Sequence, residues 1–345
     1  MPWYLENAKA IQKEVEAQAQ QYQLTLTKPP GSLGALEDVA TRLAGCQGQR
    51  HPKLENIYIS VFAGDHGVAN QGVSAFPQAV TAEMIKNFAA GGAAISVLAK
   101  QLNAQFEVVN LGTVFDVPEH ATIVNAHIAN GTHDFTQQAA MSVDQLEQAL
   151  ATGQGAALRA QQAGSQLFIG GEMGIANTTS ASAIGAAYLN KPAAELVGPG
   201  TGLAADKLGM KAQVIEDAIT LHKAKTDMEI LRCLGGFEIA ALAGAYISCA
   251  QQGIAVLVDG FISTSAALMA VAINPSIKPW LFYSHESQEP GHQALLQALN
   301  AKPLLNIGMR LGEGSGAAVV VSLMQSAVAL HNHMATFAQA GVSEA

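Results

Sequence analysis

The chain has 345 residues, of which 49% are hydrophobic and 13% are charged, and its formal net charge at pH 7 is −9. This composition is typical of a folded, tightly packed protein and excludes a disordered one. The acidic balance argues against a nucleic-acid partner, because binding to phosphates needs clustered Lys and Arg side chains. The length allows one large domain with a smaller one beside it.

Nothing in the sequence indicates secretion or a membrane span. The N-terminus, MPWYLENAKAIQKEV, has acidic residues early and lacks the apolar segment of a signal peptide. The 3 cysteines are far apart without C-x-x-C spacing, so we expect core thiols, with neither disulfides nor a zinc site. The most apolar region, from Ile239 into the 270s, is interrupted by Gln251, Gln252 and Asp259, which favours a buried helix, strand and helix. We therefore expect a cytoplasmic protein.

In chain order, two helices precede any strand, and strands then alternate with helices. The first helix is predicted over 5–22, and the second begins between 32 and 37, after a Pro-Pro-Gly turn, and runs to about 43. Strands are predicted at 56–64, 106–112, 121–128 and 165–171. Helices are predicted at 78–102, with a break at Gly91-Gly92, and at 142–164, with Ser142 as the N-cap.

The second half of the chain continues the alternation. Helices are predicted at 178–189, 212–226, 236–252 and 263–273, strands at 253–260, 279–285 and 303–309, and a long final helix from 316 to about 340. The strands are short and continuously apolar, a pattern typical of a parallel sheet with helices on both faces. We therefore predict an α/β fold, in which the helices at the two chain ends form a small helical subdomain.

Polar loops follow five of the predicted strands, where an open parallel sheet binds its ligands. Their sequences are AGDHGVANQGVS, GGEMGIANTTS, DGFISTS, SHES and RLGEGSG. Glu172 and Asp259 are strong candidates for chemistry, because packing seldom needs a carboxylate at a strand end. Either residue could instead only accept backbone hydrogen bonds. Glu313 lies between two glycines, which let other groups approach its carboxylate closely.

Other polar features are weaker evidence for a site. LVGPGTGL (196–203) could hold a phosphate with help from Lys207 or Lys211, or it could be a plain turn. It matches neither a Walker loop nor a dinucleotide-binding motif. Asp65-His66 lacks further metal ligands nearby, so Asp65 could simply order its loop. His331 and His333 point to different faces of the last helix and are interpreted as solvated. We therefore predict no metal site.

Seven motifs occur in one order across nearly the whole chain: KPPGSLGALEDVA, FAGDHGVANQGVSAFPQAVT, GGEMGIANTTSASAI, LVGPGTGL, GGFEIAALAGA, DGFISTSAAL and IGMRLGEGSGAA. With them the sequence resembles the nicotinate-nucleotide–dimethylbenzimidazole phosphoribosyltransferases of cobalamin biosynthesis. The resemblance implies transfer of phosphoribose from nicotinate mononucleotide to 5,6-dimethylbenzimidazole, giving α-ribazole 5′-phosphate and nicotinate. It also implies a homodimer without a cofactor. Each chain would have a Rossmann-like large domain (46–319) and a small helical domain built from 1–45 with 320–345.

The resemblance also implies roles for single residues. Glu313 matches the family's general base, which would take the benzimidazole N–H proton from a dry pocket that raises its pKa. Glu172 matches the second active-site glutamate and would stabilise positive charge on the ribose. The implied substrate-binding residues are Gly174, Gly200, Thr201, Gly202 and Lys211 at the phosphate, Ser263 and Ser284 as further polar contacts, Asp259, and Ser74, Phe76, Gln78 and Leu311 around the benzimidazole.

Two other functions stay open at this point. A nucleotide glycohydrolase would use water in place of the aromatic base and would release nicotinate without any benzimidazole. A non-catalytic nucleotide-binding protein on the same fold would tolerate the loss of Glu313.

Overall fold

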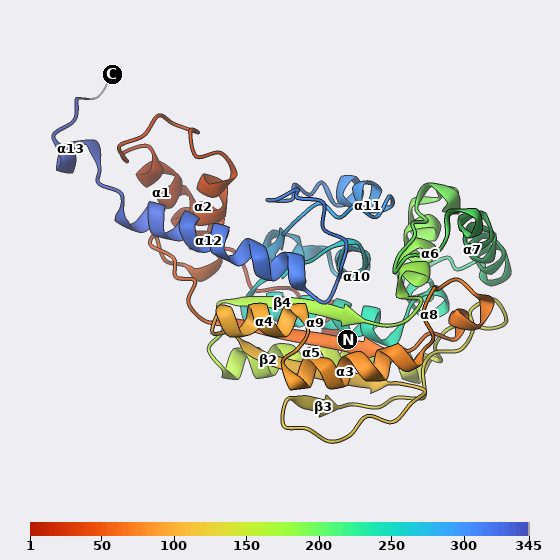
Figure 1. The fold of residues 1–345 in the computed structure, drawn as a ribbon. Coiled ribbons are helices and arrows are strands. Elements are labelled where there is room, and N and C mark those ends of the chain that lie inside the picture. Colours follow the sequence, from red (N-terminus) through yellow and green to blue (C-terminus); the bar gives the residue numbers. More distant parts are fainter. Residues whose placement is uncertain (344–345) are drawn as a thin grey trace.

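A computed structural model describes residues 1–343, and its centre is a sheet of six strands. The strands are β1 (Ile57–Gly64), β2 (Gln105–Gly112), β3 (Ile123–Asn125), β4 (Leu167–Met173), β5 (Ala255–Val258) and β6 (Leu281–Tyr283). They lie in the order β3-β2-β1-β4-β5-β6, and every neighbouring pair is parallel (Figure 1). This is the Rossmann strand order, and the predicted α/β fold class is confirmed.

Most helices lie close to their predicted positions. They are α1 (Lys13–Gln23), α2 (Ala35–Gln47), α3 (Ala79–Ala90), α4 (Ala94–Gln101), α5 (Val143–Gln162), α6 (Asn177–Leu189), α7 (Leu208–His222), α8 (Asp227–Leu234), α9 (Phe237–Gln252), α10 (Phe261–Ile273), α11 (His292–Leu299), α12 (Ser315–His333) and α13 (Phe337–Ala340). The predicted break between α3 and α4 is confirmed at Gly91, whose φ of 81° ends α3. Ser142 caps α5 as predicted, in a capping box with Gln145.

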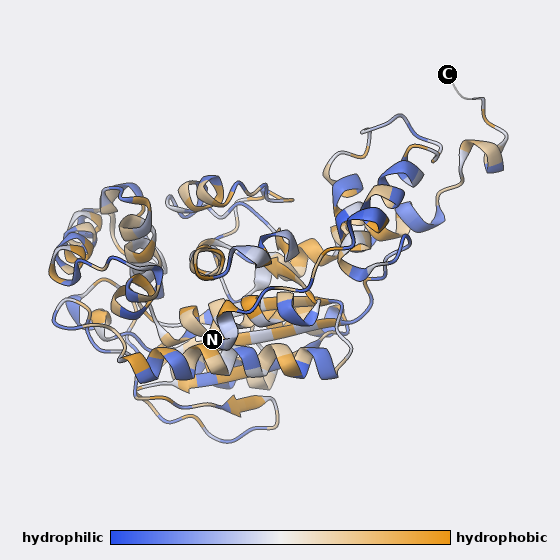
Figure 2. Cartoon of the chain, turned by 180° about the vertical axis from the view of Figure 1, so that it is seen from behind, coloured by the Kyte–Doolittle hydropathy of each residue, from blue (hydrophilic) through white to orange (hydrophobic). Residues whose placement is uncertain are grey.

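Apolar side chains of the helices and strands pack into one core. Figure 2 colours the hydrophobic residues of these elements orange. Every residue of β1 is buried. Helix α9 contacts β1, β2, β4 and β5, and α5 packs along α9. Gly153 and Gly244 permit this close approach, since a Cβ on either would overlap a backbone carbonyl oxygen of the other helix. Cys46, Cys233 and Cys249 are buried free thiols, as predicted.

Two predicted elements are wrong because backbone groups in them have partners elsewhere. The first helix begins only at Lys13, since the chain before it runs along other elements. There the Lys9 N–H donates to the Ala250 carbonyl, and its own carbonyl accepts from Trp280. The predicted strand at 303–309 is reduced to one bridge between Leu305 and His285. The sequence reasoning also missed α8 and α11, and it ran the last helix past its end at His333.

Helices α1 and α2 lie together with α12 and α13 at one end of the molecule, while the N-terminus itself lies beside the central sheet (Figure 1). Inside this group His331 is fully buried, with its ring 2.8 Å from both Gln23 Nε2 and the Arg50 carbonyl. Its interpretation as a solvated residue was therefore wrong, while His333 is exposed. The division into 1–45 with 320–345 and 46–319 stays a prediction. Within residues 1–343, no helix is long and apolar enough to cross a membrane.

Candidate active site

A cavity of about 630 Å³ lies at the carboxyl ends of the strands, where ligands bind in sheets of this strand order. Its volume is in the range that small-molecule sites occupy. Its walls include nine of the predicted residues: Phe76, Glu172, Gly174, Gly200, Thr201, Asp259, Ser263, Leu311 and Glu313. They come from the loop after β1, the end of β4 and the loop after it, the residues from the end of β5 into α10, and the segments before α7 and α12. The sheet therefore brings together residues far apart in the sequence.

Glu313 lies in a strained backbone segment. Gly312, Glu313 and Gly314 all have positive φ, at 87°, 65° and 87°. Glycine adopts this conformation freely, whereas Glu313 does so at a cost on the order of 1 kcal/mol. Its carboxylate is buried and accepts a hydrogen bond of 3.3 Å from the Ile95 N–H, in the first turn of α4. Burial raises the Glu313 pKa, as does Asp259, and the Ile95 bond only partly offsets this. A carboxylate of this kind suits a general base.

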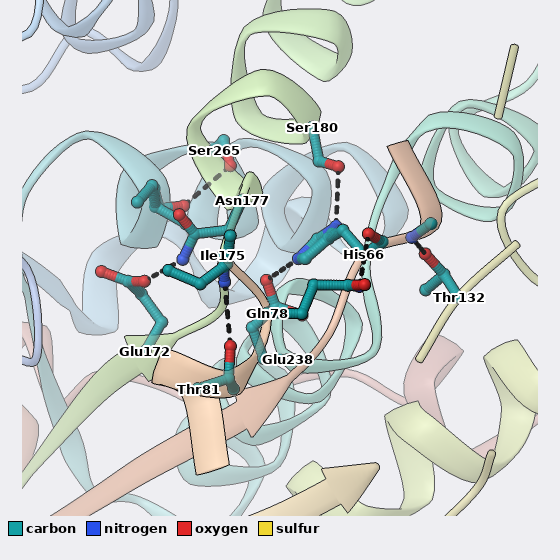
Figure 3. A network of polar contacts seen from close by, with 12 residues as sticks. His66, Gln78, Thr81, Thr132, Glu172, Ile175, Asn177, Ser180, Glu238 and Ser265 are labelled. Atoms are coloured by element: carbon teal, nitrogen blue, oxygen red, sulfur yellow. Dashed lines mark hydrogen bonds and ion pairs between the residues drawn. The ribbon is translucent and has the colours of Figure 1, made fainter. Parts of the chain in front are cut away.

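Glu172 projects from β4 against the segment that carries Glu313. A Cβ on Gly171 would overlap the Glu313 carbonyl oxygen, and one on Gly312 would overlap Glu172 Oε1. The two glycines therefore let the two glutamates share one wall of the cavity. Asn177, at the start of α6, donates a hydrogen bond to Glu172 Oε2 and fixes its direction (Figure 3).

The surroundings of Glu172 disfavour its charged form. Burial raises the Glu172 pKa to about 8, and the nearby carboxylates of Glu238, Asp259 and Glu313 add to the effect. The Asn177 bond acts in the opposite direction. At neutral pH the empty site therefore holds a mostly protonated Glu172. A ligand that brings positive charge next to this group would favour its ionised form.

We expect Gly171→Ala to lower kcat/KM about tenfold although it removes no charged side chain, because displacing catalytic groups slightly is costly. The new Cβ would push the Glu313 backbone out of its position. The measurement is steady-state kinetics beside Gly209→Ala, an exposed helical site with nothing within 4 Å of the added Cβ. Equal activities of the two variants would contradict the interlocking of β4 with the 312–314 segment.

Asp259 and Ser263 order the cavity wall through backbone contacts. Asp259 Oδ1 accepts a 2.7 Å hydrogen bond from the Ala317 N–H, at the start of α12, and lies 3.8 Å from His285 Nδ1. The sequence left open the alternative that Asp259 only accepts hydrogen bonds from the backbone. The bond from the Ala317 N–H agrees with that part of the alternative. Burial raises its pKa although His285 opposes the shift. The Ser263 hydroxyl donates to the Gly170 carbonyl at 3.2 Å.

The glycine-rich segment 198–202 is held by charged side chains that the sequence reasoning mostly missed. The Gly200 N–H donates to Glu289 at 3.1 Å, and the Gly200 carbonyl accepts from Arg310, also at 3.1 Å. Glu289 and Arg310 line the cavity. Since the Gly200 N–H already has a partner, it is not a free donor for a phosphate. Arg310 places a cation at the cavity wall. The one signal for Arg310 was its position beside Glu313 in RLGEG.

Lys211 lies behind this segment and does not line the cavity. It is fully buried, and its Nζ donates to the Gly198 carbonyl at 3.1 Å and to Thr178 Oγ1 at 2.9 Å. Burial lowers its pKa to about 8, although Glu289 opposes the shift. Its direct contact is therefore with the chain around the predicted phosphate end of the site.

Four other predicted residues also lie outside the cavity wall. Ser74 Oγ accepts from the Phe76 N–H, Gln78 donates to the His66 carbonyl, and Ser284 Oγ lies 3.0 Å from His285 Nδ1. Gly202 is exposed in the glycine-rich segment. Within residues 1–343, no group of three or more His, Cys, Asp or Glu side chains could hold a metal ion. Asp65 accepts from the Val114 N–H, as the interpretation of backbone hydrogen bonding held, but this bond ties its loop to the segment after β2.

The whole chain is similar to known phosphoribosyltransferases. A family model described as "Phosphoribosyltransferase" matches residues 8–342. The nicotinate-nucleotide–dimethylbenzimidazole phosphoribosyltransferase of Pseudomonas fluorescens is 56% identical over 344 residues, or 99% of this chain and 98% of the relative. The enzyme of that name from Azotobacter vinelandii is 55% identical over 346 residues, with the same coverage of 99% and 98%. The crystal structure of CobT from Thermus thermophilus superimposes with a TM-score of 0.92 at 41% identity, over 96% of this chain and 100% of that one.

Proposed function

The chain belongs to this phosphoribosyltransferase family, and we propose that it transfers the 5-phosphoribosyl group of nicotinate mononucleotide to 5,6-dimethylbenzimidazole. The products are α-ribazole 5′-phosphate and nicotinate, in the nucleotide-loop branch of cobalamin biosynthesis. The observation that carries this proposal is the pair of buried glutamates, Glu172 and Glu313, on one cavity. The relatives that bear the name of this reaction match almost the full chain at more than half identity.

In the proposed reaction, one benzimidazole nitrogen attacks C1′ of the ribose as the bond from C1′ to the nicotinate nitrogen breaks. The electron pair of the broken bond returns to the pyridine ring, so nicotinate leaves without needing a proton. The other benzimidazole nitrogen then loses its proton to the carboxylate of Glu313. The buried position of Glu313 and its raised pKa support this role as base.

Glu172 responds to the charge of the nucleotide. The pyridinium ring of nicotinate mononucleotide is cationic, and positive charge moves to the ribose as the glycosidic bond breaks. This charge favours the ionised form of Glu172, which then stabilises the transition state electrostatically. The phosphate lies toward Arg310, with Lys211 supporting the 198–202 segment from behind. The apolar side chains of Phe76, Val80, Met84 and Leu311 provide walls for the flat benzimidazole.

Nicotinate release from nicotinate mononucleotide, measured with and without dimethylbenzimidazole, tests the proposal, with the nucleotide product identified by mass and by its anomeric proton signal. We expect release that depends on the base and yields the α-ribazole phosphate. Equal nicotinate release without dimethylbenzimidazole would mean that the protein is a glycohydrolase and not a transferase. Binding of the nucleotide without release under either condition would point to the non-catalytic alternative.

We further propose that the enzyme works in the cytoplasm as a homodimer. Its resemblance to the family supports the dimer, and sedimentation of the purified protein tests it. The charged nucleotide substrate does not cross a bilayer unaided, so the enzyme must share the compartment in which that nucleotide is made. Fractionation of cells that express the protein tests the location.

A further inference from the structure

A buried network of three polar side chains, His66, Glu238 and Ser180, lies beside the cavity and includes none of the residues assigned to substrates. His66, which follows β1, is fully buried. Its Nε2 lies 2.5 Å from Glu238 Oε1, and its Nδ1 lies 2.9 Å from Ser180 Oγ (Figure 3). Glu238 belongs to the first turn of α9, and Ser180 belongs to α6. The loop after β1 and two helices therefore meet at one imidazole.

This network of side chains connects to the cavity on two sides. Ser180 lies one helical turn after Asn177, which donates a hydrogen bond to Glu172. On the other side, the His66 carbonyl accepts a 3.0 Å hydrogen bond from Gln78, the N-cap residue of α3. Helix α3 carries Val80 and Met84 of the cavity wall. His66 therefore contacts both α6, which orients Glu172 through Asn177, and the start of α3, which lines the proposed benzimidazole pocket.

Two glycines let the backbone pack closely against the imidazole. A Cβ on Gly174 would lie 3.2 Å from His66 Nε2, and one on Gly236 would overlap the ring at Cε1. Gly174 itself lines the cavity two residues after Glu172. The segment that carries Glu172 therefore packs directly against the ring. This close packing makes the position of the ring part of the geometry of the site.

We propose that His66 is a positioning residue for the transfer reaction, which acts with Glu238 and Ser180 to hold α6, and through Asn177 the Glu172 carboxylate, in place. This inference rests on the proposed function. In the neutral ring, the Ser180 hydroxyl donates to Nδ1 and Nε2–H donates to Glu238. That bond gives the fully buried Glu238 its partner, since its second carboxylate oxygen, Oε2, has none within residues 1–343.

The chain contains a matched pair of substitutions for the test. Ser180 and Ser182 are both fully buried serines of α6, but the Ser182 hydroxyl donates to the Leu196 carbonyl, away from His66. We expect Ser180→Ala to lower kcat about tenfold with less than a twofold change in KM, as for an interaction that matters mainly in the transition state. Ser182→Ala should keep kcat within about twofold of the unmodified enzyme. Equal kcat values for these two variants, at similar melting temperatures, would overturn the proposal.

Glu238→Gln distinguishes the effect of the hydrogen bond between His66 and residue 238 from the effect of the Glu238 charge. The amide oxygen can still accept from His66, but the negative charge that faces Glu172 is gone. The other ionisable groups facing Glu172 are Asp259 and Glu313, and Asp65 faces His66 and Glu238. We expect kcat to stay within about threefold, while the titration of Glu172 in the pH profile of kcat/KM moves down by about one unit. If the pH dependence of kcat/KM did not change in Glu238→Gln, the network of His66, Glu238 and Ser180 would not be coupled to Glu172.

All of these variants are assayed by benzimidazole-dependent nicotinate release. If the unmodified enzyme shows no such release, the proposed function fails first. If it turns over and Ser180→Ala behaves like Ser182→Ala, only the positioning role fails.

Discussion

Glu313→Gln is expected to fold normally and to lose between about 10²- and 10⁴-fold in kcat, the usual contribution of a positioned general base. Glutamine keeps an oxygen that can accept from the Ile95 N–H and preserves the size of the side chain. It cannot accept the benzimidazole proton. Single-turnover measurements with saturating substrates report the chemical step directly, and the melting temperature of the variant confirms its fold.

Two controls distinguish a base from a structural carboxylate. Glu286→Gln changes a carboxylate between two residues of the cavity wall that itself lies outside the cavity and accepts from Asn306, so its turnover should be normal. Glu313→Gly removes the strain of a non-glycine residue at φ 65° and opens space for a small carboxylate. Added formate should therefore restore part of the activity of Glu313→Gly. Normal turnover by folded Glu313→Gln would end the role of this residue as base.

The candidate site could be predicted from the sequence as far as parallel strands determine it. The carboxyl ends of such strands share one edge of the sheet, so loops that follow apolar runs were expected to meet there. Glu172, which follows the predicted strand 165–171 and lies at the end of β4, and Asp259, which follows β5, were found in this way. Glu313 reaches the same cavity although the strand predicted before it does not form.

The residues that were missed have roles that depend on contacts distant in the sequence. Glu289 and Arg310 look like ordinary surface charges in the sequence, yet both hold Gly200 from a segment about a hundred residues away. His66 was weighed as a metal ligand, because its neighbour in sequence is Asp65. Its actual partner is Glu238, which no local pattern connects to it. Lys211 looked like a phosphate ligand, but helix α7 buries it behind the 198–202 segment.

The kcat/KM for nicotinate mononucleotide is expected to rise about tenfold between pH 7 and pH 9, because it reports the ionisation of essential groups in the free enzyme. Burial and the neighbouring carboxylates raise the Glu172 pKa to about 8, so only a minor fraction of the empty enzyme has this group ionised at pH 7. Since the ionised form stabilises the cationic ribose, activity follows that fraction upward. Lys211, whose pKa is also about 8, titrates in the same range. The pH profile alone therefore does not assign the change to Glu172.

Glu172→Gln makes that assignment. It should remove the rise between pH 7 and pH 9 and lower kcat by about 10²- to 10³-fold, the usual cost of losing one electrostatic contact to a transition state. If Glu172→Gln kept the rise, a different group would control the pH profile.

The pH dependence of the protein's stability tests the raised pKa of Glu172 independently of activity. The folded protein retains the Glu172 proton up to about pH 8, whereas the unfolded chain releases it near the ordinary pKa of 4.5. Stability from this group is therefore complete below pH 4.5 and is lost as the pH rises to about 8. Glu172→Gln lacks this loss, so its melting temperature should exceed that of the unmodified protein more at pH 8.5 than at pH 5. A difference that did not change with pH would mean that Glu172 titrates normally, and the role of its raised pKa in the reaction would fall with it.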